Sequence, residues 1–234
     1  LPGHEETYGG SHFDVFPSAN LNYSFGGGKR IRASYSMRVR RPSSGVLNPI
    51  NTSSDPLHVR IGNPDIEPQY THSVSLNASW SGSAGNLRLS PYYQKTTNDW
   101  AAITTVDDQG ISTRTYQNLA SQESYGASLT YSMRQRDGWG GHVSISGRKL
   151  NRDASNLDAG LSNNAVGFST RLNTTVTIRP DLSLQASYFY RSPLDSETGR
   201  IAAMTAADLA VRQQFMDNRA SLSLRVRDLF GTMG

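Results

Sequence analysis

The stretch KRIRASYSMRVRR, residues 29–41, places an apolar or small side chain at every second position, with arginine or serine between them. A period of two residues is typical of a β-strand with two different faces, because successive side chains of a strand point to opposite sides. The alternation is also longer than the usual strand of a soluble protein. The stretch therefore predicts a long strand with one apolar face and one face rich in arginine.

The same alternation recurs along the chain and predicts an all-β protein. About ten strands can be counted in this way. The clearest further segments are ANLNYSF (19–25), THSVSLNASW (71–80), YGASLTYSM (125–133), VGFSTRLNTTVTI (166–178), LSLQASYFY (182–190) and ASLSLRVRDLF (220–230).

The connections between these strands alternate between short and long. Short turns are expected at 26–29, 81–86, 134–141, 179–182 and 216–219, and the connections between them lie at 41–70, near 107–110, around 151–163 and at 192–199. Outer-membrane barrels show this pattern systematically, with short turns on one side and longer loops outside. The pattern favours a transmembrane, antiparallel, up-and-down β-barrel in which residues 41–70 form a long external loop.

A soluble β-sandwich remains an alternative, because its strands also alternate between a core face and a solvent face. Strand length separates the two. A strand that crosses a bilayer at a tilt needs about nine to eleven residues, and the segments above reach that length, whereas sandwich strands are commonly about five or six residues long.

The composition excludes several other classes. No window approaches the length of apolar sequence that a transmembrane helix needs. Cysteine is absent and the five histidines lack ligand spacing, so we predict no metal site. The net charge of +4 is not gathered into one basic patch, which argues against nucleic-acid binding. No catalytic motif is present, and we expect neither an enzyme nor a cofactor.

Residues 40–76 carry a specific combination of motifs. They are the Arg-Pro pair at 41–42, Leu-Asn-Pro at 47–49, Asp-Pro at 55–56 and the run GNPDIEPQ at 62–69. In this order they resemble a segment of TonB-dependent outer-membrane receptors, especially the β-barrel portion of receptors of Bacteroidetes-like lineages. YYQKTTNDW (92–100) and DLAVRQQFMDNRASLSLRVRDLFGT (208–232) extend the similarity over nearly the whole chain. Ile66 and Gln69 depart from the pattern, where leucine and glutamate are usual.

The resemblance implies a 22-stranded barrel with an N-terminal plug domain and a TonB box. Residues 1–234 would then be a partial barrel domain, a C-terminal fragment without plug or box, because an open sheet would leave unpaired strand edges in lipid. A closed barrel of about ten strands is the alternative.

Ligand binding, if it occurs on this chain, is expected at arginines of the polar face and at polar residues of the long loop. Such arginines can hold an anionic ligand, since guanidinium groups suit carboxylate, phosphate and sulfate. The preferred interpretation, however, is that they pair with acids of the plug or with Asp208 and Asp228 and hold the interior together. The candidate residues are Arg32, Arg38, Arg40, Arg41, Asn63, Glu67, Arg212, Arg225 and Arg227.

The first functional hypothesis is therefore a receptor fragment for energy-dependent, TonB-linked uptake of a scarce nutrient in the outer membrane of a Gram-negative-type bacterium. Its partners would be outer-membrane lipid, a plug domain, TonB and a small nutrient ligand. The alternative is a structural or adhesive outer-membrane barrel without transport.

Overall fold

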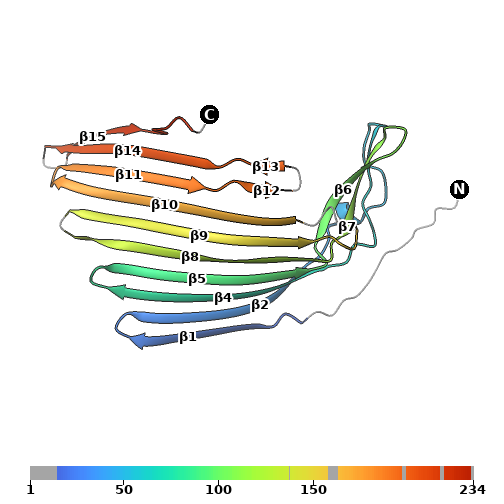
Figure 1. Cartoon of the computed structure of the whole chain (residues 1–234), viewed down its shortest axis with the longest axis horizontal. Helices are drawn as coiled ribbons and strands as arrows, with labels where there is room; N and C mark the ends of the chain where they lie inside the picture. Colours follow the sequence, from blue (N-terminus) through green and yellow to red (C-terminus); the bar gives the residue numbers. More distant parts are fainter. Residues whose placement is uncertain (1–14, 137, 158–162, 197–198, 217–218, 233–234) are drawn as a thin grey trace.

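One ten-stranded antiparallel sheet makes up most of the molecule (Figure 1). The computed structural model describes residues 15–136, 138–157, 163–196, 199–216 and 219–232. Parts of the expected 1–234 domain, including 1–14, and parts of the connections expected at 134–141, 151–163, 192–199 and 216–219 lie outside these ranges. The strands follow one another across the sheet in chain order, as the alternation predicted.

The strands of the main sheet are long, and most of them exceed the length that a tilted crossing of a bilayer requires. Their order is β1 (Ser18–Gly26), β2 (Lys29–Arg40), β4 (Gln69–Gly82), β5 (Gly85–Thr97), β8 (Ser121–Arg136), β9 (Trp139–Asp153), β10 (Asn163–Arg179), β11 (Leu182–Arg191), β14 (Met204–Phe215) and β15 (Ala220–Val226).

The two ends of the sheet differ in their connections. The turns after β1, β4, β8, β10 and β14 are short and lie together at one end, which we call the short-turn end (Figure 1). Residues 41–68, 98–120, 154–162 and 192–203 connect strands at the opposite, long-connection end. The predicted alternation of short and long connections is therefore present in the fold.

The long connections contain structure of their own. Residues 41–68 include the short helix α1 (Ser44–Leu47) and the strand β3 (His58–Arg60). The connection after β5 forms a hairpin of β6 (Trp100–Val106) and β7 (Ser112–Asn118), and β3 pairs with β7 in parallel. We call β3, β6 and β7 the mini-sheet. After β11, β12 (Leu194–Ser196) pairs with β13 (Gly199–Ile201). No helix within the described ranges is long and apolar enough to cross a membrane.

The register gives the main sheet an apolar and a polar face. Leu89, Leu129 and Ile145 are directly paired across β5, β8 and β9, and so share one face. They are 37%, 42% and 43% exposed, although they lie in central strands. No second layer covers this face in the described part of the chain, which removes the sandwich alternative. Such a face requires lipid rather than water as its solvent.

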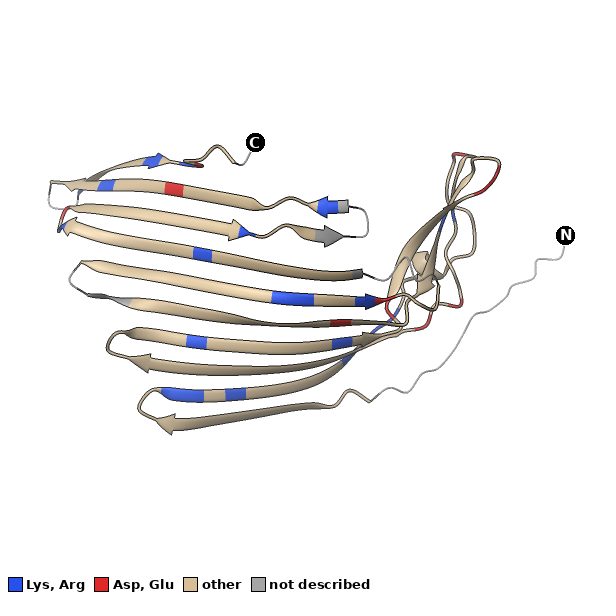
Figure 2. Ribbon diagram, in the orientation of Figure 1, with Lys and Arg blue, Asp and Glu red and all other residues tan. Residues whose placement is uncertain are grey.

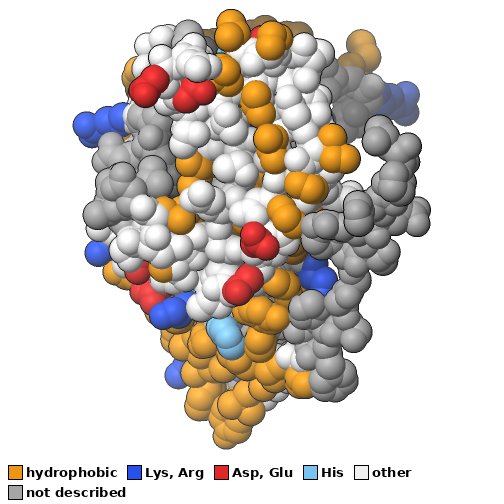
Figure 3. All heavy atoms as spheres, turned by 90° about the vertical axis from the view of Figure 1, so that its right-hand side faces the viewer, with side chains coloured by type: hydrophobic (Ala, Val, Ile, Leu, Met, Phe, Trp, Pro, Cys, Tyr) orange, Lys and Arg blue, Asp and Glu red, His pale blue; other side chains and the backbone are white. Residues whose placement is uncertain are grey.

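The small buried core lies at the long-connection end. Ile66, Leu119 and Ala154 are at most 6% exposed and belong to the connections there. The mini-sheet adjoins the main sheet there, where Arg40 of β2 lies over the Trp100 ring of β6 and Asn156 Nδ2 donates to the carbonyl of Asn118. It projects beyond the strand ends (Figure 1). Seen from this end, uncharged polar groups cover much of the surface and hydrophobic side chains gather toward the lower part of the view (Figure 3).

Candidate functional site: the polar face of the sheet

The polar face carries a large excess of positive charge. Among the strand residues whose side chains the structure describes, its only acid is Asp208, whereas its arginines number eleven. Acidic residues instead gather at the mini-sheet end (Figure 2). The arginines are Arg30, Arg32, Arg38, Arg40, Arg88, Arg148, Arg152, Arg171, Arg191, Arg212 and Arg225.

Some of these arginines have neutral partners. Arg32 Nε donates a hydrogen bond of 2.6 Å to Asn22 Oδ1 on the neighbouring strand. The Arg40 guanidinium lies 4.8 Å from the ring centroid of Trp100, and that of Arg171 lies 5.3 Å from the ring of Phe189. These contacts hold the side chains without neutralising them.

Asp208 does not pair with an arginine. Its carboxylate accepts hydrogen bonds from Ser187 Oγ at 3.3 Å and from the backbone N–H of Asp228 at 3.0 Å. The expected pairing of the polar-face arginines with Asp208 is therefore not found, because Asp208 fixes the end of β14 against the segment after β15. Most of the positive charge on this face remains unbalanced by the described residues.

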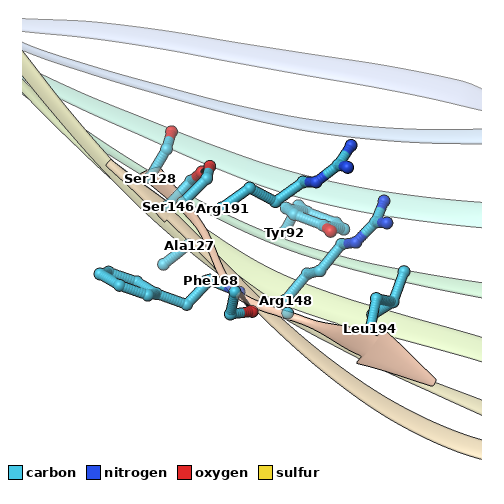
Figure 4. Close-up of a pocket in the computed structure, with 12 residues that line it drawn as sticks. Tyr92, Ala127, Ser128, Ser146, Arg148, Phe168, Arg191 and Leu194 are labelled. Carbon is cyan, nitrogen blue, oxygen red and sulfur yellow. Dashed lines mark hydrogen bonds between the residues drawn. The ribbon is translucent and has the colours of Figure 1, made fainter. Parts of the chain in front are cut away.

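A hollow of about 440 Å³ opens in the middle of the polar face. Arg148 of β9 and Arg191 of β11 stand beside it, on the same side of the sheet as the ring of Tyr92 (Figure 4). Neither guanidinium has an ion-pair partner within the described ranges. The side chain of Phe168 points to the opposite, apolar side (Figure 4). The hollow therefore offers two free cations and one aromatic ring.

Small residues create this hollow. Ser90, Ser128, Ser146 and Ser169 form one row across β5, β8, β9 and β10, and the row ends at Arg191. Ser146 Oγ lies 2.8 Å from Ser169 Oγ, so neighbouring hydroxyl groups satisfy each other. A side chain larger than serine in this row would fill the space between the two arginines.

The structure divides the residues predicted to bind ligand into separate groups. Arg32, Arg38 and Arg40 lie on the polar face of β2, near one edge of the sheet, and Arg212 and Arg225 lie on β14 and β15 at the other edge. The two groups do not meet within the ten strands. The remaining two arginines, Arg41 and Arg227, directly follow the ends of β2 and β15 at the long-connection end.

Asn63 and Glu67 hold the connection 41–68 against the mini-sheet. Asn63 Nδ2 donates to the carbonyl of Tyr116 at 3.0 Å, and its Oδ1 accepts from the N–H of Asp65. The Glu67 carboxylate accepts from Asn98 Nδ2 at 2.7 Å. The hydrogen bonds of both side chains therefore hold loop segments in place.

Sequence reasoning missed Tyr92, Arg148 and Arg191 as members of one site. Alternation along β9 does place Arg148 on the polar face, because the next residue, Lys149, lies on the apolar face. However, these three residues come from β5, β9 and β11. Only the register between strands shows that they surround one hollow, and no spacing within a single strand could have shown it.

Asp99 lies in the connection between β5 and β6, at the junction between the main sheet and the mini-sheet, and its carboxyl group has a raised pKa. Burial raises the pKa of its carboxyl group above the usual 3.8, although nearby Arg152 and Arg40 act in the opposite direction. The carboxylate accepts a hydrogen bond from the buried side chain of Gln69. A buried acid of this kind binds its proton more tightly in the folded state than in the unfolded state.

We expect the junction to become less stable as the pH rises through the raised pKa of Asp99, because the folded state then has to hold a desolvated charge. The contribution of Asp99 is most favourable below about pH 3.8. Hydrogen exchange in β6 and β7, corrected for intrinsic rates, should show this trend. Asp99→Asn should abolish it, while Asp108→Asn, at the exposed hairpin tip, should leave it intact. A trend that persists in Asp99→Asn would assign it to another group.

A single-layer sheet with a lipid-type face, a cationic face and one set of short turns defines an outer-membrane β-barrel wall. The chain belongs to the outer membrane protein β-barrel family, whose model matches residues 3–234. The expected fold class and outer-membrane location are thereby confirmed. The polar face consequently lines the barrel interior and the apolar face contacts lipid. No curated protein matches the chain.

Solved structures with the same fold are outer-membrane receptors and transporters. The siderophore receptor PirA from Pseudomonas aeruginosa superposes with a TM-score of 0.68 at 13% identity, over 92% of this chain and 38% of that chain. The ferric enterobactin receptor PfeA of the same organism, in complex with enterobactin, superposes with a TM-score of 0.68 at 15% identity, over 92% of this chain and 35% of that chain. The copper transporter OprC superposes with a TM-score of 0.65 at 14% identity, over 92% of this chain and 33% of that chain. The ten-stranded sheet matches part of 22-stranded barrels, so the chain spans little more than a third of these proteins.

Proposed function

We propose that this sheet is part of the wall of a receptor for TonB-linked, energy-dependent uptake of a scarce nutrient across the outer membrane. The observation that carries the proposal is the unbalanced positive charge of the polar face, which includes Arg148 and Arg191 beside the central hollow. A water-filled interior that is lined by one sign of charge attracts ligands of the opposite sign. The long-connection end, including residues 41–70, would then face the outside.

The structural matches support a metal-containing nutrient. PirA and PfeA are named for siderophores and OprC for copper. We therefore infer a ligand with anionic character, such as a ferric siderophore. Arg32, Arg38, Arg40, Arg212 and Arg225 would contribute to the same interior field as Arg148 and Arg191. The proposed partners are lipid on the apolar face, and a plug domain and TonB for gating. Binding and gating need no covalent chemistry.

Uptake of radiolabelled ferric enterobactin and of radiolabelled copper by cells with and without the intact gene tests this proposal. We expect uptake of ferric enterobactin, the anionic compound of the two, to depend on the gene and to stop when a protonophore collapses the proton-motive force. Gene-dependent uptake of copper alone would contradict an anionic ligand. The double substitution of Arg148 and Arg191 by Gln should weaken uptake at limiting ligand by about tenfold, the order of effect for lost charge-assisted hydrogen bonds. Arg179→Gln, at the short-turn end, is the matched control.

Uptake that survives the protonophore would contradict an energy-dependent receptor. If the gene is irrelevant to the uptake of both compounds, the structural or adhesive barrel becomes the better hypothesis.

A further inference from the structure

Two arginines are direct neighbours on the mini-sheet. Arg60 of β3 is paired with Arg114 of β7, and in a parallel pair such residues share a face at a strand spacing of about 4.8 Å. Like charges placed side by side on adjacent strands destabilise the pair. The mini-sheet therefore carries a local electrostatic cost that its own fold does not explain.

No neighbouring acid relieves this repulsion. Within the described ranges neither guanidinium forms an ion pair or a side-chain hydrogen bond, and both side chains are exposed. The next residue in the row is Thr104 of β6, which is paired with Arg114 and is uncharged. Two unneutralised guanidinium groups thus stand together in water.

Asp55 is the acid that lines the same hollow as Arg60 and Arg114, and its acceptor atoms are already engaged. Asp55 Oδ1 accepts from the N–H of Leu57 at 2.9 Å, and Oδ2 lies 2.9 Å from His58 Nδ1. The bond from Leu57 is the main reason that the pKa of Asp55 lies below its usual value, with the contact to His58 second. Asp55 therefore serves its own turn and His58 rather than the arginines.

The two arginines separate two hollows. One, of about 500 Å³, is also lined by hydroxyl-bearing residues, among them Thr104 and Ser112, and by the hydrogen-bonded pair of Asp55 and His58. The other, of about 270 Å³, lies toward Gly62 and Tyr116. A chemical group that entered the larger hollow would lie near two guanidinium groups and several hydroxyl groups.

The frame around the arginines is held by backbone contacts. Asn51 Oδ1 accepts from the N–H groups of Ser53 and Arg60, and the N–H of Thr52 donates to the carbonyl of Arg60 at 3.1 Å. On the other side, the N–H of Ile61 donates to the carbonyl of Arg114 at 3.1 Å. The backbone that carries both arginines is therefore held before any ligand arrives, so binding has to order only the side chains.

We propose that Arg60 and Arg114 form a binding site for a doubly charged tetrahedral oxyanion, the phosphate monoester group of a water-soluble ligand, for which inorganic sulfate is a soluble mimic. Each guanidinium can donate two parallel hydrogen bonds, so one tetrahedral group between them can satisfy both forks and cancel both charges. A single carboxylate carries one charge and would leave half of the positive charge unbalanced. The hydroxyl groups of Thr104 and Ser112 can complete the donor set.

This site does not depend on the transport proposed above. It requires only that the mini-sheet contacts water at the membrane surface. If both proposals hold, the mini-sheet is the place where the anionic part of a ligand is first held.

Calorimetric titration of the full-length protein in detergent micelles with phenyl phosphate and with inorganic sulfate tests the site. We expect saturable binding that Arg60→Gln and Arg114→Gln each weaken by about tenfold or more. Substitution of both residues by lysine should recover only part of the affinity, because lysine keeps the charge but loses the fork. Arg30→Gln, at the short-turn end of β2, should bind as the unaltered protein does.

Absence of binding, or equal losses in Arg30→Gln, would overturn the proposal. So would binding to vesicles that contain phosphorylated lipid together with none to the soluble phosphate, since the ligand would then be a lipid headgroup. Oxyanion binding without energy-dependent uptake leaves this site standing and removes the transport proposal. Uptake without oxyanion binding leaves the transport proposal standing and removes this site.

Discussion

Substituting Leu172 by Arg should cost about 2–4 kcal/mol of folding stability in a bilayer, the range for arginine at the midplane of an outer-membrane barrel. Leu172 lies in the middle of β10, on the apolar face, between Val143 of β9 and Tyr188 of β11. Its side chain is 42% exposed because lipid is its only covering. Denaturant titration of the protein refolded into vesicles measures the loss.

The adjacent residue provides a matched control. Asn173→Arg introduces the same side chain one position along the same strand, but on the polar face beside His142 and Ser187. We expect a change below about 1 kcal/mol, because interior positions of a barrel tolerate charge. Equal losses in the two variants would mean that the faces have been assigned wrongly.

Gly62→Ala should separate the segment after β3 from the α1 segment of the same connection, while leaving the ten-stranded sheet folded. A Cβ atom at Gly62 would lie 2.5 Å from the carbonyl oxygen of Val46, and 2.6 and 2.7 Å from the carbonyl oxygen and nitrogen of Asn48. These are backbone atoms, and the two carbonyl oxygens also accept the hydrogen bonds of Gly62 and Asn63. No small rotation can relieve all three clashes, so the connection has to move.

Trypsin cleavage after Arg60 measures this detachment. We expect cleavage at least several-fold faster in Gly62→Ala, with the protease resistance of the main sheet unchanged. Gly45→Ala is the control in the same connection, since a Cβ atom there would have nothing within 4 Å. Unchanged cleavage in Gly62→Ala would show that the connection accommodates the methyl group without separating from the α1 segment.

Much of the main sheet can be predicted from alternation alone. The period in residues 29–41 correctly separates Arg32 and Arg38 from Tyr35 and Val39, because in a strand the face depends only on whether a position is odd or even. The positions of the short turns follow from the same pattern. The order of neighbours is then simple, because consecutive strands pair in chain order.

The sites could not be predicted in the same way. Register depends on turn geometry, and it shifts between Met133 and Arg136 and between Thr177 and Arg179. The hollow beside Arg148 depends on that register. The mini-sheet is further out of reach, because β3 has only three residues, lies in a proline-rich connection and pairs with a strand that the sequence indicated only as a turn near 107–110. The adjacency of Arg60 and Arg114 follows from this pairing alone.

The row of serines on the polar face determines how hydroxyl groups are arranged along the barrel wall. Hydroxyl groups both donate and accept, so a polar group that leaves one serine finds an equivalent partner about 4.8 Å away on the next strand. The row from Ser90 to Ser169 runs across the strands. Because barrel strands are tilted by about 35–45°, a line across them winds around the bore. The band of hydroxyl groups therefore runs obliquely around the inner wall, like a segment of a screw thread.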